Sequence, residues 1–179
     1  DHGRNMARGF EQVRIRIKTA VDKDIGTILK TVAMALMSAS GGACGQLYAN
    51  FFLRGAAAVI AKEELTLQEL LDLFNAGLEG VFQRGRAMPG EKTIVDTLGP
   101  ATAAIQQAAN AGHDIPKALQ QALIAGGEGM KATVSMQAKK GRASYLGERS
   151  IGHQDPGATS AYLILKALHQ AVHQFTHIQ

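Results

Sequence analysis

The chain has a single cysteine and no tryptophan among its 179 residues. One cysteine cannot form an internal disulfide, which excludes a disulfide-stapled scaffold and leads us to expect a reducing, cytoplasmic location. No uninterrupted apolar run reaches about 18 residues, so no membrane-spanning helix is expected. The first residues also lack the pattern of a secretory signal. The length suits one ordinary globular domain, and we expect residues 1–179 to form it.

A strong excess of one charge is absent as well. Nineteen Lys and Arg residues against fifteen Asp and Glu residues give a formal net charge of +4. The basic residues gather only at Lys139, Lys140 and Arg142. Direct nucleic-acid binding usually requires a denser basic stripe. We therefore expect no direct contact with nucleic acid and no attachment to a membrane.

Strand-like alternation is nearly absent too, and the short stretch 13–17 that shows it also fits a helix. Apolar residues instead recur every three or four positions, as they do on one face of a helix. The two clearest series are Phe10, Val13, Ile17, Val21 and Ile25, Leu29, Val32, Leu36, Ala39. The sequence therefore predicts an all-α fold, with six or seven helices packed as antiparallel neighbours.

Several of the expected helices have recognisable ends. Residues 66–69 (TLQE) have the form of a capping box, and Asp114 followed by Pro116 is typical of a helix start. Another helix is expected to begin near Leu47. The helix after Asp114 contains three glycines within residues 126–129, so we expect its middle to be weak or bent.

The unusual chemistry lies between the expected helices. Residues 1–5 (DHGRN) supply a carboxylate, an imidazole and an amide within one short stretch. Residues 41–45 (GGACG) precede a helix, where backbone amides can bind an anion, although a bare glycine cluster is more often a simple turn. Residues 139–154 form a long loop dense in glycine, arginine and hydroxyl groups. Such a loop indicates organisation around a ligand, and phosphate suits the planar donors of arginine.

Four segments together resemble one family. They are DHGRNM at 1–6, GGACG at 41–45, GEKT at 90–93 and GRASYLGERSIGHQDPG at 141–157. In order and spacing they are similar to the L subunit of dihydroxyacetone kinase. The resemblance extends over essentially the whole chain, and the segment 141–157 is its most specific part.

The resemblance implies an antiparallel barrel of about eight amphipathic helices, the first of which would precede Asp1. A nucleotide and a pair of Mg²⁺ ions would lie at one rim. In phosphotransferase-coupled members, ADP stays bound as a coenzyme, and a phosphohistidine on a partner M subunit rephosphorylates it to ATP. The γ-phosphoryl group then passes to dihydroxyacetone held by a K subunit. The resemblance therefore implies a phosphoenolpyruvate-dependent phosphotransferase.

The resemblance also implies roles for individual residues. Asp1 corresponds to the last of a set of metal-binding aspartates, and the others would precede it. The residues that correspond to nucleotide contacts are His2, Gly3, Arg4, Asn5, Ala43, Cys44, Gly85, Ile94, Arg142, Asp155, Pro156 and Gly157. Arg142 is also the candidate catalytic residue, because an arginine can stabilise charge on a transferring phosphoryl group. Cys44 stands where relatives commonly have serine, and a thiol is the weaker hydrogen-bonding group.

Three functions remain open on the sequence. The first is the phosphotransferase-coupled L subunit. The second keeps the fold and the nucleotide but changes the donor or acceptor, as in an ATP-dependent dihydroxyacetone kinase or a fatty-acid kinase. The third is a non-enzymatic partner of a transcription regulator. A homodimer is compatible with all three.

Overall fold

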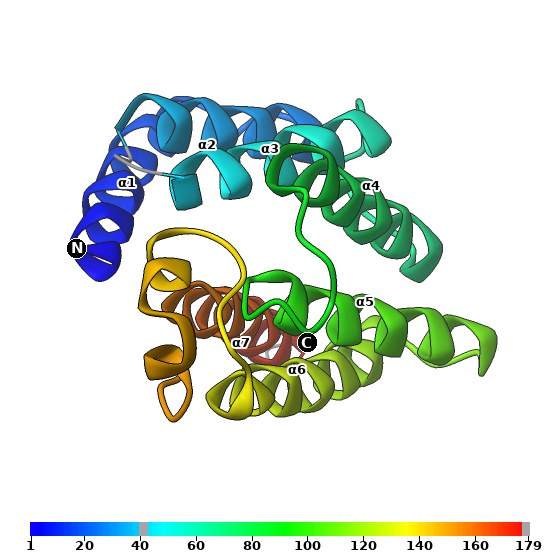
Figure 1. Ribbon diagram of the computed structural model, residues 1–179. Coiled ribbons are helices and arrows are strands. Elements are labelled where there is room, and N and C mark those ends of the chain that lie inside the picture. The colour runs from blue at the N-terminus through cyan, green and yellow to red at the C-terminus, as the bar shows by residue number, and fades with distance from the viewer. Residues whose placement is uncertain (40–42, 177–179) are drawn as a thin grey trace. The chain divides into compact units, whose positions relative to one another are not determined.

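The computed structural model describes residues 1–39 and 43–176 (Figure 1). Within these residues there are seven α-helices, three 3-10 helices and no strand, which confirms the all-α fold class. No helix in this part of the chain is long and apolar enough to cross a membrane. The chain falls into two compact units, residues Asp1–Arg86 (unit 1) and Ala87–Gln179 (unit 2). The single domain over residues 1–179 stays a prediction.

Unit 1 is built from four α-helices that follow one another in alternating directions. They are α1 (His2–Arg16), α2 (Ile25–Ala39), α3 (Ala43–Ala58) and α4 (Leu67–Gly85). Helix α2 packs on α1 and α3, and α3 packs on α4 (Figure 1). Leu36, Leu71 and Phe74 are among the buried side chains between them. Because of the alternation, the start of α1, the start of α3 and the end of α4 belong to the same end of unit 1.

Two details of unit 1 differ from the sequence prediction. Helix α1 changes at Ile17–Thr19 to a 3-10 helix, which has about 3.0 residues per turn and so shifts the apolar face. The 3-10 helix ends at Thr19, so Val21, predicted on the buried helical face, lies in the turn that follows and is 71% exposed. Helix α3 begins at Ala43 rather than near Leu47, so Gly45 lies inside the helix. The other glycines of that cluster, at 41 and 42, lie outside the described residues.

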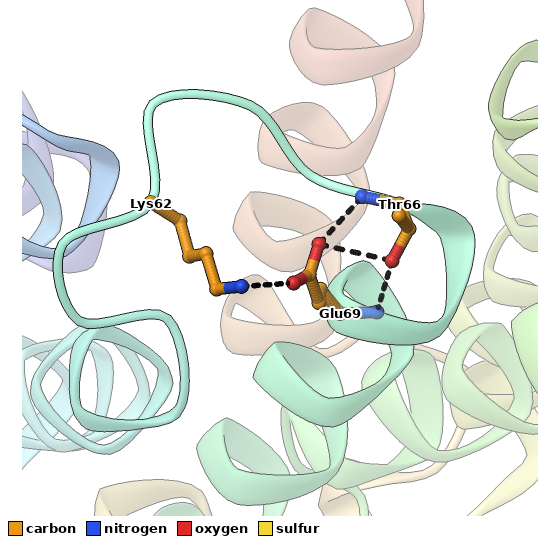
Figure 2. A network of polar contacts seen from close by, with 3 residues as sticks. All are labelled: Lys62, Thr66 and Glu69. Atoms are coloured by element: carbon orange, nitrogen blue, oxygen red, sulfur yellow. Dashed lines mark hydrogen bonds and ion pairs between the residues drawn. The ribbon is translucent and has the colours of Figure 1, made fainter.

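The capping box at the start of α4 is confirmed (Figure 2). Thr66 Oγ1 accepts a hydrogen bond from the Glu69 amide at 3.3 Å, and a Glu69 carboxylate oxygen accepts one from the Thr66 amide at 2.8 Å. Lys62 Nζ lies 2.6 Å from the other carboxylate oxygen. The Lys62 contact, followed by the bonds from Thr66, holds the pKa of Glu69 at about 2.

We expect the stability difference between the wild type and Glu69→Gln to depend on pH. The folded-state pKa of Glu69 lies below its ordinary value of 4.5, so ionised Glu69 stabilises the folded state above that value and loses this effect as the pH falls toward 2. Melting temperatures measured from pH 7 to pH 2 should show the wild type above the variant at neutral pH, with the gap closing in acid. A gap that stays constant over that range would contradict the assignment.

Unit 2 contains three α-helices that all contact one another, together with two 3-10 helices. The α-helices are α5 (Val95–Asn110), α6 (Ile115–Ala132) and α7 (Pro156–Thr176), and the 3-10 helices are Thr133–Ser135 and Arg142–Ser150. Ile105, Leu119 and Leu165 are buried between the α-helices. Asp114 caps α6 as predicted, since its side chain accepts from the Lys117 amide at 2.9 Å.

The glycines of α6 have a packing role that the sequence did not indicate. Helix α6 is continuous through all three. A Cβ atom on Gly129 would lie only 1.9 Å from the Asp96 carbonyl oxygen of α5. Cβ atoms on Gly126 and Gly127 would meet Leu165 and Tyr162 of α7 at 3.0 and 3.1 Å. These glycines therefore let α5 and α7 approach the backbone of α6 closely.

We expect Gly129→Ala to lower the free energy of unfolding by about 3 kcal/mol, because the backbone oxygen of Asp96 cannot move away as a side chain could. Gly99→Ala in α5 is the matched control, since a Cβ at Gly99 meets nothing within 4 Å. The control should be neutral or stabilising by about 0.5–1 kcal/mol. Urea denaturation of both variants measures the difference, and equal effects would contradict the close approach.

Candidate functional site

The predicted residues at the start of the chain form one helix terminus. Asp1 is the N-cap of α1, and His2 to Asn5 make its first turn. Asp1, Gly3 and Arg4 are exposed, whereas His2 and Asn5 are half-buried. Burial lowers the pKa of His2 below its ordinary value. A polar first turn at the positive end of a helix dipole is suited to an anionic group.

The other predicted residues of unit 1 also lie at helix ends. Ala43 and Cys44 are the first residues of α3, and Gly85 is the last residue of α4. A Cβ on Gly85 would lie 3.1 Å from a methyl carbon of Leu47, one turn into α3. The structure thus brings the end of α4 beside the start of α3.

The described residues do not form a magnesium site by themselves. Across residues 1–39 and 43–176, no three His, Cys, Asp or Glu side chains group closely enough to hold a metal ion. Asp1, the predicted ligand, is an exposed side chain at a helix cap. Mg²⁺ requires near-octahedral oxygen coordination, which one carboxylate cannot supply.

In unit 2 the structure brings Ile94, Asp155 and Gly157 together at the starts of α5 and α7. Ile94 is the buried N-cap of α5, and Pro156 is the first residue of α7. A Cβ on Gly157 would lie 2.8 Å from Ile94 Cγ2 and 2.9 Å from Asp155 Oδ2. Only glycine fits between these two side chains, which explains this residue type without reference to a ligand.

Asp155 is buried and caps α7. Its Oδ2 accepts from the Ala158 amide at 2.7 Å, and its own amide donates to Thr133 Oγ1 at 3.0 Å. Burial raises the pKa of the Asp155 carboxyl above its ordinary value, although the Ala158 and Gly157 amides and the Lys92 charge partly oppose this. Asp155 thus has a structural role as a helix cap in addition to its predicted nucleotide contact.

Arg142 begins a 3-10 helix instead of lying in an irregular loop, as the polar segment 139–154 had suggested. This helix spans Arg142–Ser150 and is interrupted at Gly147, where φ is 56°. Arg142 is exposed, and Tyr145 in the same helix is 87% exposed. Arg142 therefore lies in the outer part of a segment whose two ends are anchored more deeply.

The anchor is Lys92, whose role the sequence analysis missed. Lys92 is only 4% exposed. Its Nζ donates to the carbonyl oxygens of Thr133 at 2.7 Å, Met136 at 3.1 Å, Ser150 at 2.8 Å and His153. The predicted organising ligand of this segment was phosphate. At its base, however, the segment is organised around the ammonium group of a lysine.

Further hydrogen bonds hold the same region. The Asp96 carboxylate accepts from the amides of Gly90 and Thr93, which fixes the turn that carries Lys92. The Ala138 amide donates to Ser150 Oγ at 2.9 Å. The only hint of this arrangement in the sequence is the segment GEKT just before a helix, and nothing in that pattern identifies the partners of the lysine.

Comparison with known proteins first defines the structural class. The fold is similar to that in the crystal structure of the dihydroxyacetone kinase of C. freundii (native form), with a TM-score of 0.59 at 24% identity. The match covers 83% of this chain and 24% of that one.

The DAK2 domain family matches residues 1–170, and the chain belongs to this family. It is 48% identical over 168 residues to an Escherichia coli K12 protein named PEP-dependent dihydroxyacetone kinase, ADP-binding subunit DhaL, covering 94% of this chain and 80% of that protein. It is 40% identical to a Lactococcus lactis protein named PTS-dependent dihydroxyacetone kinase, ADP-binding subunit DhaL, covering 96% and 81%. The family resemblance drawn from the sequence is therefore confirmed.

We expect Thr133→Val to cost about 1–3 kcal/mol of unfolding free energy, because it removes the acceptor of the buried Asp155 amide while keeping the side-chain shape. Thr31→Val is the matched control: the Thr31 hydroxyl donates only to the Thr27 carbonyl oxygen of its own helix, at 2.9 Å. Urea denaturation should show a small effect for the control. A loss at Thr133 no larger than the loss at Thr31 would contradict the link between Thr133 and Asp155.

Proposed function

We propose that this chain is the ADP-binding subunit of a phosphoenolpyruvate-dependent dihydroxyacetone kinase. The observation that most supports this is the 48% identity across 94% of the chain with the E. coli subunit of that name. Bound ADP is phosphorylated to ATP by a phosphohistidine on an M subunit. The γ-phosphoryl group then passes to dihydroxyacetone held by a K subunit.

The helix ends described above supply groups suited to a nucleotide. In this proposal the phosphates take their hydrogen bonds from His2–Asn5 and from the start of α3 at Ala43 and Cys44, because helix N-termini present free amides. Gly85 and Ile94 contact the adenosine part of the nucleotide, and Asp155–Gly157 make the remaining contacts with it.

In this proposal Arg142 stabilises the negative charge on the phosphoryl group during transfer. Its planar guanidinium offers several donors to phosphoryl oxygens, and its exposure leaves it accessible to a substrate brought by a partner subunit. Phosphoryl transfer depends mainly on positioning and charge stabilisation, so one arginine at this point has a large effect.

Finer features belong to the same proposal. Mg²⁺ accompanies the nucleotide, with Asp1 as one of its carboxylate ligands. The K and M subunits are the partners, and the cytoplasm is the location. A homodimer and a complex with a transcription regulator remain predictions from the sequence.

Reconstitution tests the function. The full chain is mixed with the K and M subunits of a phosphoenolpyruvate-dependent dihydroxyacetone kinase, the upstream phosphotransferase proteins and dihydroxyacetone, and dihydroxyacetone phosphate is measured. Product that requires both the chain and phosphoenolpyruvate supports the proposal. Product formed with ATP, at an undiminished rate without the M subunit, would instead support the ATP-dependent kinase.

In the same assay we expect Arg142→Ala to lower the transfer rate about 100-fold or more, since it removes charge stabilisation from the transition state. Arg149→Ala is the matched control, because Arg149 is an exposed arginine of the same 3-10 helix beyond Gly147. The control should transfer at close to the wild-type rate. An Arg142→Ala protein with normal transfer would remove Arg142 from the mechanism.

A further inference from the structure

We propose that Lys92 is a positioning residue for Arg142, acting through the base of the segment 137–149. This inference rests on the proposed function, because it assigns Lys92 a role within the nucleotide site. Lys92 itself is buried and is not placed in contact with the nucleotide.

The four oxygen atoms around the ammonium come from both ends of that segment. Thr133 and Met136 precede it, and Ser150 and His153 follow it. One charged group therefore connects the two ends of the segment, at residues 133–136 and 150–153. A change at this point moves everything between residues 137 and 149, including Arg142.

The environment of the Lys92 ammonium requires a group that donates hydrogen bonds and carries positive charge. A lysine ammonium has three N–H donors and no acceptor, so four carbonyl oxygens fully use its hydrogen-bonding capacity. Thr133 and Ser150 are themselves buried, so their carbonyl oxygens would lose a donor in an apolar setting. The cage also resembles a site for a monovalent cation, in which carbonyl oxygens take the place of water.

The outer part of the segment depends on this base for its orientation. Ser144 makes local bonds, with both its hydroxyl and its amide donating to the Gly141 carbonyl oxygen. Tyr145 is largely exposed. Local bonds of this kind fix the shape of the outer turn. The Lys139 amide also donates to the Glu91 carbonyl oxygen at 3.1 Å, which ties this part of the segment to the same turn that carries Lys92.

The backbone at Lys92 supports a specific requirement for this side chain. Its φ is 62°, in the left-handed region where glycine is the easiest residue to accommodate. A lysine at that position bears a conformational cost. Strained residues of this kind tend to occur where surrounding interactions over-determine them, often near functional sites.

A double-mutant cycle in the full chain tests the inference, with ADP affinity measured by calorimetry. We expect Lys92→Met to raise the Kd for ADP about 10-fold alone, but less than about twofold in the Arg142→Ala background, because coupled residues are non-additive. Lys140→Met is the matched control: Lys140 lies on the same segment and forms a surface ion pair with Glu91 at 3.7 Å. It should change the Kd less than about twofold.

Chemical rescue provides a second readout that keeps the test decisive if Lys92→Met folds poorly. Lys92→Ala removes three side-chain carbons and the nitrogen. n-Propylammonium supplies the same atoms and the positive charge, whereas n-propanol has a similar size but no charge. We expect n-propylammonium, and not n-propanol, to restore ADP affinity.

Equal restoration of ADP affinity by the two compounds would overturn the positioning role. A Lys92→Met change in the Kd for ADP that is the same in the wild-type and Arg142→Ala backgrounds would also overturn it. A wild-type chain that binds ADP while Lys92→Met binds it equally well refutes this inference alone. A wild-type chain that binds no ADP refutes the proposed function and this inference with it.

Discussion

One buried positive charge, on Lys92, holds together the part of unit 2 that contains Arg142 and Asp155. The Lys92 ammonium is stabilised by four carbonyl dipoles, which offset the cost of removing a charge from water. Thr133 supplies one of these carbonyl oxygens and also accepts from the Asp155 amide through its hydroxyl. Asp155 in turn caps α7. The end of α6, the segment with Arg142 and the start of α7 are therefore connected through one set of hydrogen bonds.

The parts of this chain that the sequence predicted well are local. The Thr66–Glu69 capping box and the Asp114 cap depend on residues three positions apart, so their chemistry is visible in the sequence. The roles of Lys92 and Gly129 depend on contacts between distant segments: Lys92 Nζ reaches carbonyl oxygens 41 to 61 positions away. Nothing in the local pattern specifies such partners. Val21 shows a third case, in which the helix ends earlier than the apolar spacing predicts, so the last residue of the series lies in an exposed turn.

The residues of the candidate site stay predictions, and the structure shows only where each of them lies. The family resemblance named residues at the starts of α1, α3 and α7, and the structure places them at those helix termini. It also adds structural reasons for some of them, since Gly157 must be small beside Ile94. Asp155 is a buried cap, which explains its presence even before any nucleotide is considered. The effect of Cys44 on phosphate binding stays a prediction.

The proposed role of ADP as a tightly held coenzyme of this chain is tested most directly by the nucleotide content of the purified protein. The protein is purified without added nucleotide and then denatured, and the released material is identified by chromatography and mass. We expect close to one ADP per chain. A protein that releases no nucleotide, and that binds neither ADP nor ATP when either is added with magnesium, would contradict it.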